Sequence, residues 1–255
     1  MTEAFKIKSL SHPLVKEGMH LRKEASFKKG GDTLLITGKK QIEQLPSHIK
    51  IETLYTTSDA TPLRAKYEKH LVVSEEILKK ITGLVNPEPY AAIIYYKKKT
   101  PPKIEKLLVC DQISDPGNLG AIIRAAHAFE FSALFILGNC VDPFNDKVLR
   151  AAKGSIFHIP LLGGNFEELL LLIKENNLLF FQADLEGKKL NELKEISPFA
   201  LAVGNEANGT SNEVKKKAQA ITIPMSQNLE SLNVAVAAGI LMYNLSELCQ
   251  KTITT

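Results

Sequence analysis

Six short apolar segments in the second half of the chain constrain its fold most. They are Lys106–Ile113, Ala133–Leu137, Ile156–Leu161, Leu178–Ala183, Phe199–Val203 and Ala220–Ile223. Several are continuously apolar, which is the pattern of parallel strands covered on both faces. Stretches of helical spacing lie between and after them, at Asn118–Glu130, Asn145–Ala152, Phe166–Asn176, Ser211–Lys217 and Leu232–Leu248. This alternation predicts an α/β fold with a mostly parallel sheet and helices on both faces.

A linker separates this half from the first. The stretch Tyr95–Lys103 combines the end of an apolar strand, a lysine run and the pair Pro101-Pro102. Because two prolines can continue neither a helix nor a central strand, we place a linker at residues 98–104. It divides the chain into a domain of residues 1–97 and a domain of residues 105–255.

The first domain is expected to be a compact α/β sandwich. Strands are predicted at Thr33–Thr37, Ile51–Thr56, Leu71–Ser74 and Tyr90–Tyr96, and helices at His12–Glu24, Lys39–Leu45, Thr61–Lys69 and from Ser74 onward. Ser74 followed by two glutamates is a helix-start pattern.

The two halves differ in charge. Residues 1–103 carry 19 Lys and Arg against 11 Asp and Glu, a net charge of +8, whereas the remaining 13 Lys and Arg and 17 Asp and Glu give −4. A basic module beside an acidic one is typical of a protein whose basic part binds a polyanion such as nucleic acid. A lysine-rich surface exposed to solvent would give the same count, so charge alone leaves both explanations open.

The segment Asp111–Ala126 is the first of three that suggest chemistry. An apolar strand leads into Pro116-Gly117, and a helix follows that carries Asn118, Gly120 and Arg124. A strand, a glycine-bearing turn and a helix together present backbone N–H groups to a ligand. Arg124 stands among small and apolar neighbours, where a charge needs a reason.

The second and third segments also follow predicted strands. In Leu201–Gly209 an apolar strand ends at Gly204, and Glu206 follows two residues later. Ligands of open α/β sheets bind beyond the carboxyl ends of the strands, so this segment is a candidate ligand-binding loop. An ordinary connection between a strand and a helix would show the same sequence pattern. The third segment ends a strand at Pro224 and opens a helix rich in small residues, with Ser231 as a candidate N-cap and Asn233 in the first turn.

Several functional classes find no support in the sequence. Neither half has Gly-x-Gly-x-x-Gly after its first strand or a Gly-Lys-Ser/Thr phosphate loop, and we expect no metal because the histidines and cysteines are dispersed. No apolar run reaches the ~18 residues of a membrane span, so we expect no membrane association. The three scattered cysteines and a start without a signal-peptide pattern favour a reducing cytoplasm.

Taken together, the three segments resemble the SpoU family of RNA ribose methyltransferases, in the SPOUT class. The matching residues are Asp115–Arg124, Val203–Gly209, and Ile223–Met225 followed by Ser231–Gly239, in the order and approximate spacing of the family. Leu149–Gly154 is also similar, although serines frequent in the family are replaced by Ala152 and Ala235. Pro13–Arg22, with Lys39 after Gly38, resembles the family's L30e-like substrate-binding domain.

The resemblance implies a fold and a reaction. The second domain would carry a trefoil knot that composition and periodicity do not reveal, and it would bind S-adenosyl-L-methionine in that knot. The protein would be a homodimer with active sites near the subunit interface. It would methylate a ribose 2′-OH in structured RNA, more plausibly ribosomal RNA than transfer RNA.

The resemblance also assigns roles to residues. Arg124 would activate the hydroxyl, either by steering an RNA phosphate or, less readily, as a base, since a guanidinium is ordinarily always protonated. Asn118 would orient the catalytic loop, Glu206 would bond Arg124 or the loop backbone, and Ser231 and Asn233 would complete the pocket. The cofactor would be held by Val203, Gly204, Ile223, Met225 and Leu232. The alternatives are a non-catalytic RNA-binding protein with a degenerate knot domain and a SPOUT enzyme that modifies a base.

Overall fold

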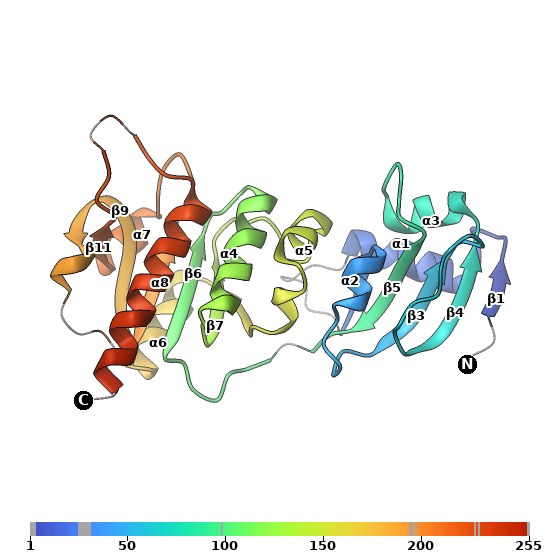
Figure 1. Cartoon of the computed structure of the whole chain (residues 1–255), viewed down its shortest axis with the longest axis horizontal. Coiled ribbons are helices and arrows are strands. Elements are labelled where there is room, and N and C mark those ends of the chain that lie inside the picture. The colour runs from blue at the N-terminus through green and yellow to red at the C-terminus, as the bar shows by residue number, and fades with distance from the viewer. Residues whose placement is uncertain are drawn as a thin grey trace. The chain divides into compact units, whose positions relative to one another are not determined.

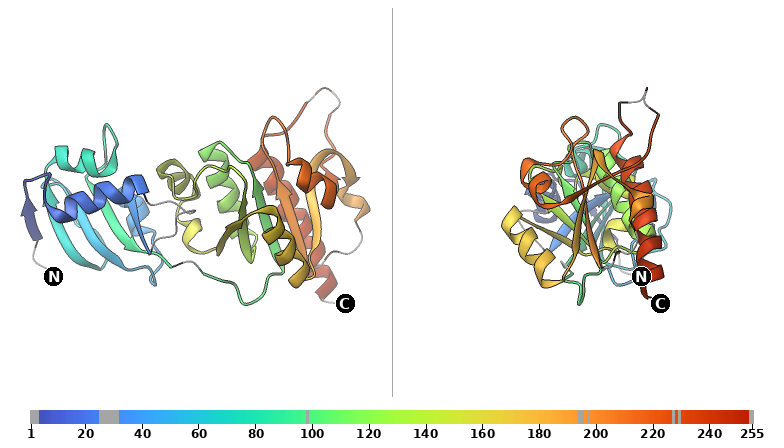
Figure 2. Two further views of the ribbon diagram at one scale, coloured as in Figure 1. Left: turned by 180° about the vertical axis from the view of Figure 1, so that it is seen from behind. Right: turned by 90° about the vertical axis from the view of Figure 1, so that its left-hand side faces the viewer.

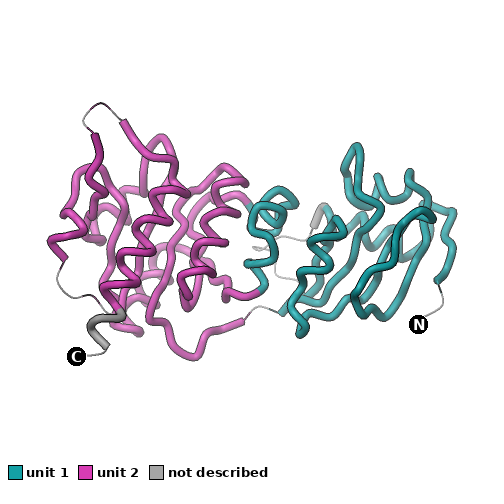
Figure 3. Tube along the Cα trace, in the orientation of Figure 1, with its two compact units in different colours: residues 1–98, 142–157 teal, residues 99–141, 158–255 magenta. Residues whose placement is uncertain are grey.

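The computed structural model of the chain describes residues 4–24, 32–97, 99–193, 196, 198–226, 228 and 230–253. The chain divides into two compact units (Figure 3). The first is built from residues 1–98 and 142–157, and the second from residues 99–141 and 158–255. The assignment of all of 105–255 to one domain therefore stays a prediction, and the compact units differ from it over 142–157.

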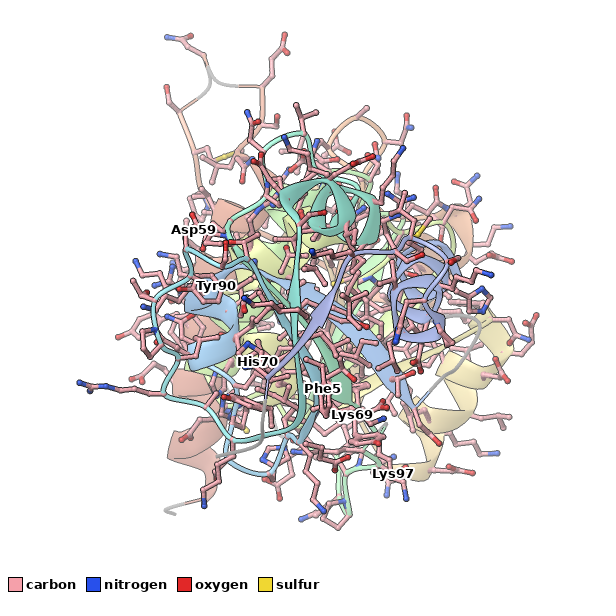
Figure 4. The ribbon with its side chains drawn as sticks, turned by 90° about the vertical axis from the view of Figure 1, so that its right-hand side faces the viewer. Phe5, Asp59, Lys69, His70, Tyr90 and Lys97 are labelled. Carbon is pink, nitrogen blue, oxygen red and sulfur yellow. The ribbon has the colours of Figure 1, made fainter. Side chains whose placement is uncertain are left out.

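A five-stranded mixed sheet forms the centre of the first unit. Its order is β1 (Ala4–Ile7), β4 (Tyr67–Val73), β3 (Ile51–Thr56), β5 (Tyr90–Tyr95) and β2 (Thr33–Thr37). Strands β1, β4 and β3 run parallel to one another, and β5 is antiparallel to both β3 and β2. Phe5 on the edge strand β1 and Lys69 and His70 on β4 are labelled in Figure 4.

Two helices pack on one face of this sheet, α1 (Pro13–Glu24) and α3 (Glu75–Thr82). Their apolar residues form one core with β3, β4 and β5, which includes Val15, Tyr55 and Ile81. Helix α3 begins where predicted, because the side chain of Ser74 accepts a hydrogen bond from the Ile77 N–H (3.3 Å). Gly83 ends it in the left-handed conformation that glycine adopts at low cost.

The segment 142–157 packs against β2 and against the residue that follows β5. It contains α5 (Asp146–Ala152) and the 3₁₀ turn η1 (Ser155–Phe157). The short helix α2 (Lys39–Glu43) also packs on β2 and β5. The ring of Tyr96 lies edge-on to Phe144 and Phe157, with centroids 5.0 and 6.0 Å away. The Thr37 hydroxyl donates to the Asp146 carboxylate (2.6 Å). These contacts explain why 142–157 groups with the first unit.

Two sequence predictions fail in the first unit. Residues 61–66 form a loop and Tyr67–Val73 is strand β4, so the helix predicted at Thr61–Lys69 is wrong. The polar run Glu68–His70 hides this strand, which is held between β1 and β3 and by an ion pair of Lys69 with Glu52 (3.3 Å). Strand β1 was not predicted, since three of its four residues are exposed.

A six-stranded, fully parallel sheet forms the second unit, as its apolar segments predict. The order is β11 (Gln219–Thr222), β9 (Leu179–Lys189), β10 (Phe199–Val203), β6 (Lys106–Asp111), β7 (Ala133–Leu137) and β8 (Leu161–Gly164). The central strands β6, β7 and β10 are almost wholly buried. A short 3₁₀ turn, η2 (Leu190–Glu192), follows β9.

Helices cover both faces of this sheet (Figures 1 and 2). On one face α4 (Pro116–Ala128) packs beside α8 (Val234–Ile253). On the other face α6 (Phe166–Glu175) and α7 (Asn212–Lys217) share a core with β6, β7 and β10 that includes Leu169, Ile173 and Val214. No helix within the described residues has the length and apolar character to cross a membrane.

Some boundaries in the second unit differ from the predictions. The expected strand Ile156–Leu161 is wrong over most of its length, because 155–157 form η1 and β8 begins only at Leu161. Helix α8 begins at Val234, not at Leu232, and α4 begins at Pro116, two residues before the predicted start.

The register of the sheet determines which loops meet. Strands β10 and β6 are neighbours, and Val203 pairs with Cys110 at their carboxyl ends. The segments that follow these two strands, 111–118 and 204–209, must therefore leave the sheet side by side. Parallel α/β sheets bind their ligands beyond such ends.

Candidate active site

The first helix of the site, α4, begins with a well-formed cap. The Asp115 carboxylate accepts a hydrogen bond from the Asn118 N–H (2.7 Å), and Pro116 occupies the first helical turn, where its missing N–H costs nothing. This cap fixes the backbone of Asn118 at the carboxyl end of β6.

The loop 204–209 folds back on its own start. Asn205 and Gly209 exchange two backbone hydrogen bonds of 2.9 Å, and the Asn205 side chain accepts from the Ala207 N–H (2.9 Å). A Cβ on Gly204 would lie 2.2 Å from the backbone of Gly209 and Thr210. Glycine is therefore required at position 204 by the loop itself, in addition to any ligand.

The last helix of the site, α8, is capped by Asn233. Its side-chain oxygen accepts from the N–H groups of Ala235 (2.9 Å) and Val236 (3.3 Å). The prediction of Ser231 as the N-cap is therefore wrong, and Ser231 instead lies in the segment before the helix. Asparagine and serine are about equally good caps, so the sequence pattern offered two candidates two residues apart.

One chain of hydrogen bonds joins the three segments. The Asn233 side-chain amide donates to the Asn118 side-chain oxygen (3.0 Å), and the Asn118 amide donates to the Glu206 carboxylate (2.5 Å). Asn118 thus stands between the loop after β10 and the start of α8. The side chain of Asn205 adds a contact of its own, donating to the Gln112 carbonyl (3.3 Å) and toward the Ser114 hydroxyl (3.4 Å).

A cavity of about 290 Å³ lies against the loop 204–209. Six predicted site residues line it: Gly204, Glu206, Ile223, Met225, Ser231 and Leu232. Val203 does not line the cavity, because it is fully buried within β10. The walls are mostly apolar, and Ile221, Val234 and Leu241 add to the predicted side chains.

One wall of this cavity is formed by residues that the sequence patterns did not predict. Ala183, Asp184 and Leu185, in the middle of β9 just beyond its pairing with β10, line it, and so does Lys215 of α7, whose ammonium group donates to the Asn208 carbonyl (3.2 Å). The signal that could have found the first three was available. They follow the apolar run of β9, which neighbours β10, and carboxyl ends of parallel neighbours share one edge.

Arg124 lies apart from the cavity. Its side chain is exposed on α4, does not line the cavity, and makes no hydrogen bond or ion pair with any residue in the described part of the chain. The buried side of the same helix is formed by Leu119, Ile122 and Ile123. Glu206 accepts from Asn118, and among the described residues it makes no bond to Arg124, which was one of its two expected partners beside the loop backbone.

The remaining reactive side chains are not arranged for metal chemistry. Across the ranges that the structure describes, no three His, Cys, Asp or Glu residues gather into a metal-binding group. Burial, and then the nearby Cys140 and Asp111, raise the pKa of the Cys110 thiol well above its ordinary value. Cys110 is therefore a protonated core thiol.

Comparison with known proteins gives consistent matches. The family model described as "SpoU rRNA Methylase family" matches residues 105–243. The 23S rRNA (guanosine(2553)-2′-O)-methyltransferase RlmP of Bacillus subtilis is 32% identical over 232 residues, which is 89% of this chain and 92% of that protein.

Solved structures extend the likeness over both units. An AdoMet-bound rRNA methyltransferase from Sinorhizobium meliloti matches with a TM-score of 0.77 and 27% identity, covering 96% of this chain and 98% of that one. A structure described as an RNA 2′-O ribose methyltransferase matches with a TM-score of 0.72 and 28% identity, covering 96% and 99%.

Proposed function

We propose that this chain, which belongs to the SpoU rRNA methylase family, transfers the methyl group of S-adenosyl-L-methionine to a ribose 2′-OH in structured RNA. Ribosomal RNA is the proposed substrate, with transfer RNA as the second choice. The observation that supports this most is the bonded chain Glu206–Asn118–Asn233. It joins the three family segments to one another, and Glu206 within it lines the cavity.

The cavity suits S-adenosyl-L-methionine. Apolar side chains of Ile223, Leu232 and Leu241 offer surfaces for a flat adenine ring, and Asp184, Thr222 and Ser231 offer polar groups for hydroxyl or ammonium groups. Gly204, Ile223, Met225 and Leu232 would hold the cofactor, whereas Val203 would support the site only from within β10. When bound, the cofactor supplies an already activated methyl group, so no metal is needed.

The side chains of this protein would handle the RNA. A guanidinium stays protonated, so we assign Arg124 to binding an RNA phosphate and steering it toward the 2′-OH. Asn118, held from both sides, would orient the substrate ribose, and its partners Glu206 and Asn233 would keep its amide from rotating. A hydroxyl is a weak nucleophile at neutral pH, and such positioning lowers the barrier to its attack.

The first unit would bind the RNA. We propose that residues 1–97 form an L30e-like domain, in keeping with a mixed sheet flanked by helices and a net charge of +8 over residues 1–103. Surface lysines and arginines would neutralise phosphates without reading sequence. We also retain the proposal of a cytoplasmic location, in keeping with the scattered positions of the three cysteines in the sequence.

The second unit would be knotted and dimeric. The proposed trefoil knot near the C-terminus is supported by β10 lying beside β6 and by α8 packing on α4, which places late segments against the earliest ones. The proposed homodimer is supported by exposed apolar side chains on α8, where Val236 and Tyr243 are each 52% exposed. The exposed Arg124 on the neighbouring α4 fits active sites near that interface.

The two alternatives are less well supported. A non-catalytic RNA-binding protein would not need Asn118, Glu206 and Asn233 to be both present and mutually bonded. A base-modifying enzyme of the same class would lack a reason for the Asn-x-Gly-x-x-x-Arg segment that begins at Asn118.

Product analysis tests the reaction. Total RNA from cells lacking the gene is incubated with the protein and tritiated S-adenosyl-L-methionine, digested to nucleosides and separated by mass-resolved chromatography. The label is expected in a 2′-O-methylnucleoside. A label on a base would replace the proposal by the base-modifying alternative, and no incorporation with retained RNA binding would support the non-catalytic one.

Arg124→Ala tests the assigned role of the arginine. We expect methyl transfer to fall by about 10²-fold or more, because the substrate phosphate loses its partner, while thermal unfolding and S-adenosyl-L-methionine binding stay unchanged. Arg124→Lys, which keeps the charge but not the paired donors, should be intermediate. Near-normal transfer by the alanine variant would remove Arg124 from the mechanism.

A further inference from the structure

Asp111 is a buried carboxylate at the carboxyl end of β6. It is 1% exposed, and its Oδ2 accepts a hydrogen bond from the backbone N–H of Ser211 (2.6 Å). Its Oδ1 has no hydrogen-bond partner among the residues that the structure describes. Burying a charge is costly unless it is well paired, so a carboxylate here needs an explanation that strand packing does not give.

Ser211, the hydrogen-bond partner of Asp111, lies close to the end of the cavity loop. Ser211 lies two residues after the end of the cavity loop 204–209 and immediately before α7. Its neighbour Thr210, itself 3% exposed, donates its hydroxyl to the buried Gln182 of β9. The returning end of the loop is thus fixed to two strands of the sheet by buried side chains.

The segment that begins at Asp111 also holds the rest of the loop. Asn205, at the start of the loop, donates to the Gln112 carbonyl, and Glu206 in the loop accepts from Asn118. Gln112 adopts a positive φ of 58°, which is uncommon for a residue with a side chain and turns the chain at the end of β6. The stretch 111–118 therefore holds the cavity loop near its start, at Glu206 and just beyond its end.

We propose that Asp111 is a positioning residue for methyl transfer. Resting on the proposed function, the inference is that its bond to Ser211 fixes the cofactor loop 204–209 relative to the segment 111–124, which would carry the groups that meet the RNA. Asp111 does not line the cavity, and at 1% exposure it is not available to a bound RNA. Its effect would be on the alignment of two bound groups and not on the binding of either.

Substitution on both sides of the bond tests this role. In the full chain, Asp111→Ala is expected to lower the single-turnover rate of methyl transfer by about 10²-fold, as a misalignment near 1 Å would. The dissociation constants for S-adenosyl-L-methionine and for RNA should each change by less than about threefold, which is small beside the expected loss of rate. Asp111→Asn keeps an oxygen that accepts from the Ser211 N–H and should restore most of the rate.

Ser211→Pro removes the donor in place of the acceptor. Residue 211 already has a φ of −61°, which proline adopts, so the backbone is not strained at that residue. This variant should show the same rate loss as Asp111→Ala, and the double variant should be no slower than either single one. The matched control is Ser132→Ala, which removes hydrogen bonds to Glu105 and Lys106 at the opposite end of β6 and should lose stability without losing rate.

Two results would overturn the positioning role. One is an Asp111→Asn rate as low as that of Asp111→Ala, and the other is additive losses in the double variant. Failure of the proposed function is seen separately in the wild-type protein. If the wild type methylates a base, the ratios among the variants still report whether Asp111 aligns the two segments.

Discussion

The absence of a methyl group at Gly204 allows the cavity loop to close. A Cβ there would lie 2.2 Å from the backbone of Gly209 and Thr210, which no side-chain rotation can relieve. We expect Gly204→Ala to force the loop open and to weaken S-adenosyl-L-methionine binding by about tenfold or more, since at least 1.4 kcal/mol of contact would be lost. Calorimetric titration measures this.

The loop interpretation of Gly204 has a clear control. RNA affinity, which we assign to the first unit, should not change in Gly204→Ala. Wild-type cofactor affinity in this variant would show that the loop can move without cost and that Gly204 is dispensable.

His70 gives the first unit a dependence on pH. It lies on β4 (Figure 4), and its Nε2 is 2.9 Å from the Thr56 hydroxyl. Burial lowers the pKa of His70 below its ordinary value of 6.5. At pH values between that lowered pKa and 6.5, the unfolded chain binds more protons at this histidine than the folded chain does. The stability that neutral His70 contributes to the folded unit is therefore fully present above about pH 6.5, and it is lost as the pH falls through the pKa of the folded state.

Replacement of this histidine should remove that loss. The melting temperature of His70→Gln is expected to fall less between about pH 7 and pH 5 than that of the wild type. His48→Gln, at an exposed histidine of the same unit, is the comparison. An unchanged slope in His70→Gln would show that other groups set the acid sensitivity.

Single residues also show what sequence patterns cannot resolve. Asn118, Glu206 and Asn233 could be selected from their segments, but their bonding to one another depends on the β6–β10 register. The same limit applies to Arg124, whose expected bond to Glu206 is replaced by that of Asn118. Asp111 was passed over because it reads as the polar end of an apolar strand, and only its contact with a residue one hundred positions away distinguishes it.

At the level of elements, the start of α8 combines a structural and a chemical role in Asn233. Its side-chain oxygen caps the helix while its amide donates to Asn118. Asn233→Ala should lower the free energy of unfolding by about 1 kcal/mol because the cap is lost. It should also lower the rate of methyl transfer. Asn233→Asp should keep the cap but lose the donor, so stability should recover while the rate stays low.

Thermal unfolding and a methyl-transfer assay on both variants separate the two roles. If Asn233→Asp recovers the rate along with the stability, the bond to Asn118 has no part in the reaction.

Elements with continuous apolar character were the predictable ones. Strands β6, β7 and β10 lie where the sequence placed them because burial on both faces leaves no polar position. Strand β4 was predicted only over its apolar end, Leu71–Val73, and its first part was missed because the polar residues there are stabilised by neighbours distant in the chain, such as Glu52. The predicted strand at Ile156–Leu161 failed for a related reason. Phe157 is buried in the 3₁₀ turn η1 and packs on the ring of Tyr96, so it is buried without pairing to a strand.

At the scale of the molecule, the exposed apolar side chains of α8, Val236 and Tyr243, are the surface on which we propose that two copies of the chain associate. Tyr243 is 52% exposed, and its ring lies 5.9 Å from that of Phe129. If this surface forms the proposed homodimer, Tyr243→Glu should place a charge in the interface and yield monomers, because an unpaired buried carboxylate is costly. Sedimentation velocity measures the mass.

The control for Tyr243→Glu is Leu171→Glu. Leu171 is 58% exposed on α6, which covers the opposite face of the sheet. It should leave the dimer intact. A monomeric wild type, or dissociation by both substitutions, would argue against an interface on α8.

The path of the chain between the two units has a consequence for synthesis. Residues 142–157 complete the first unit, yet they are separated from residues 1–98 by β6, α4 and β7 of the second. Domains usually fold in order as the ribosome releases them. Here the N-terminal unit cannot bury Tyr96 against Phe144 and Phe157 until residue 157 has left the exit tunnel. The nascent chain must therefore hold two strands and a helix of the second unit, β6, α4 and β7, unfinished while the first unit awaits its last segment. Chaperone binding would matter most during this stretch of translation.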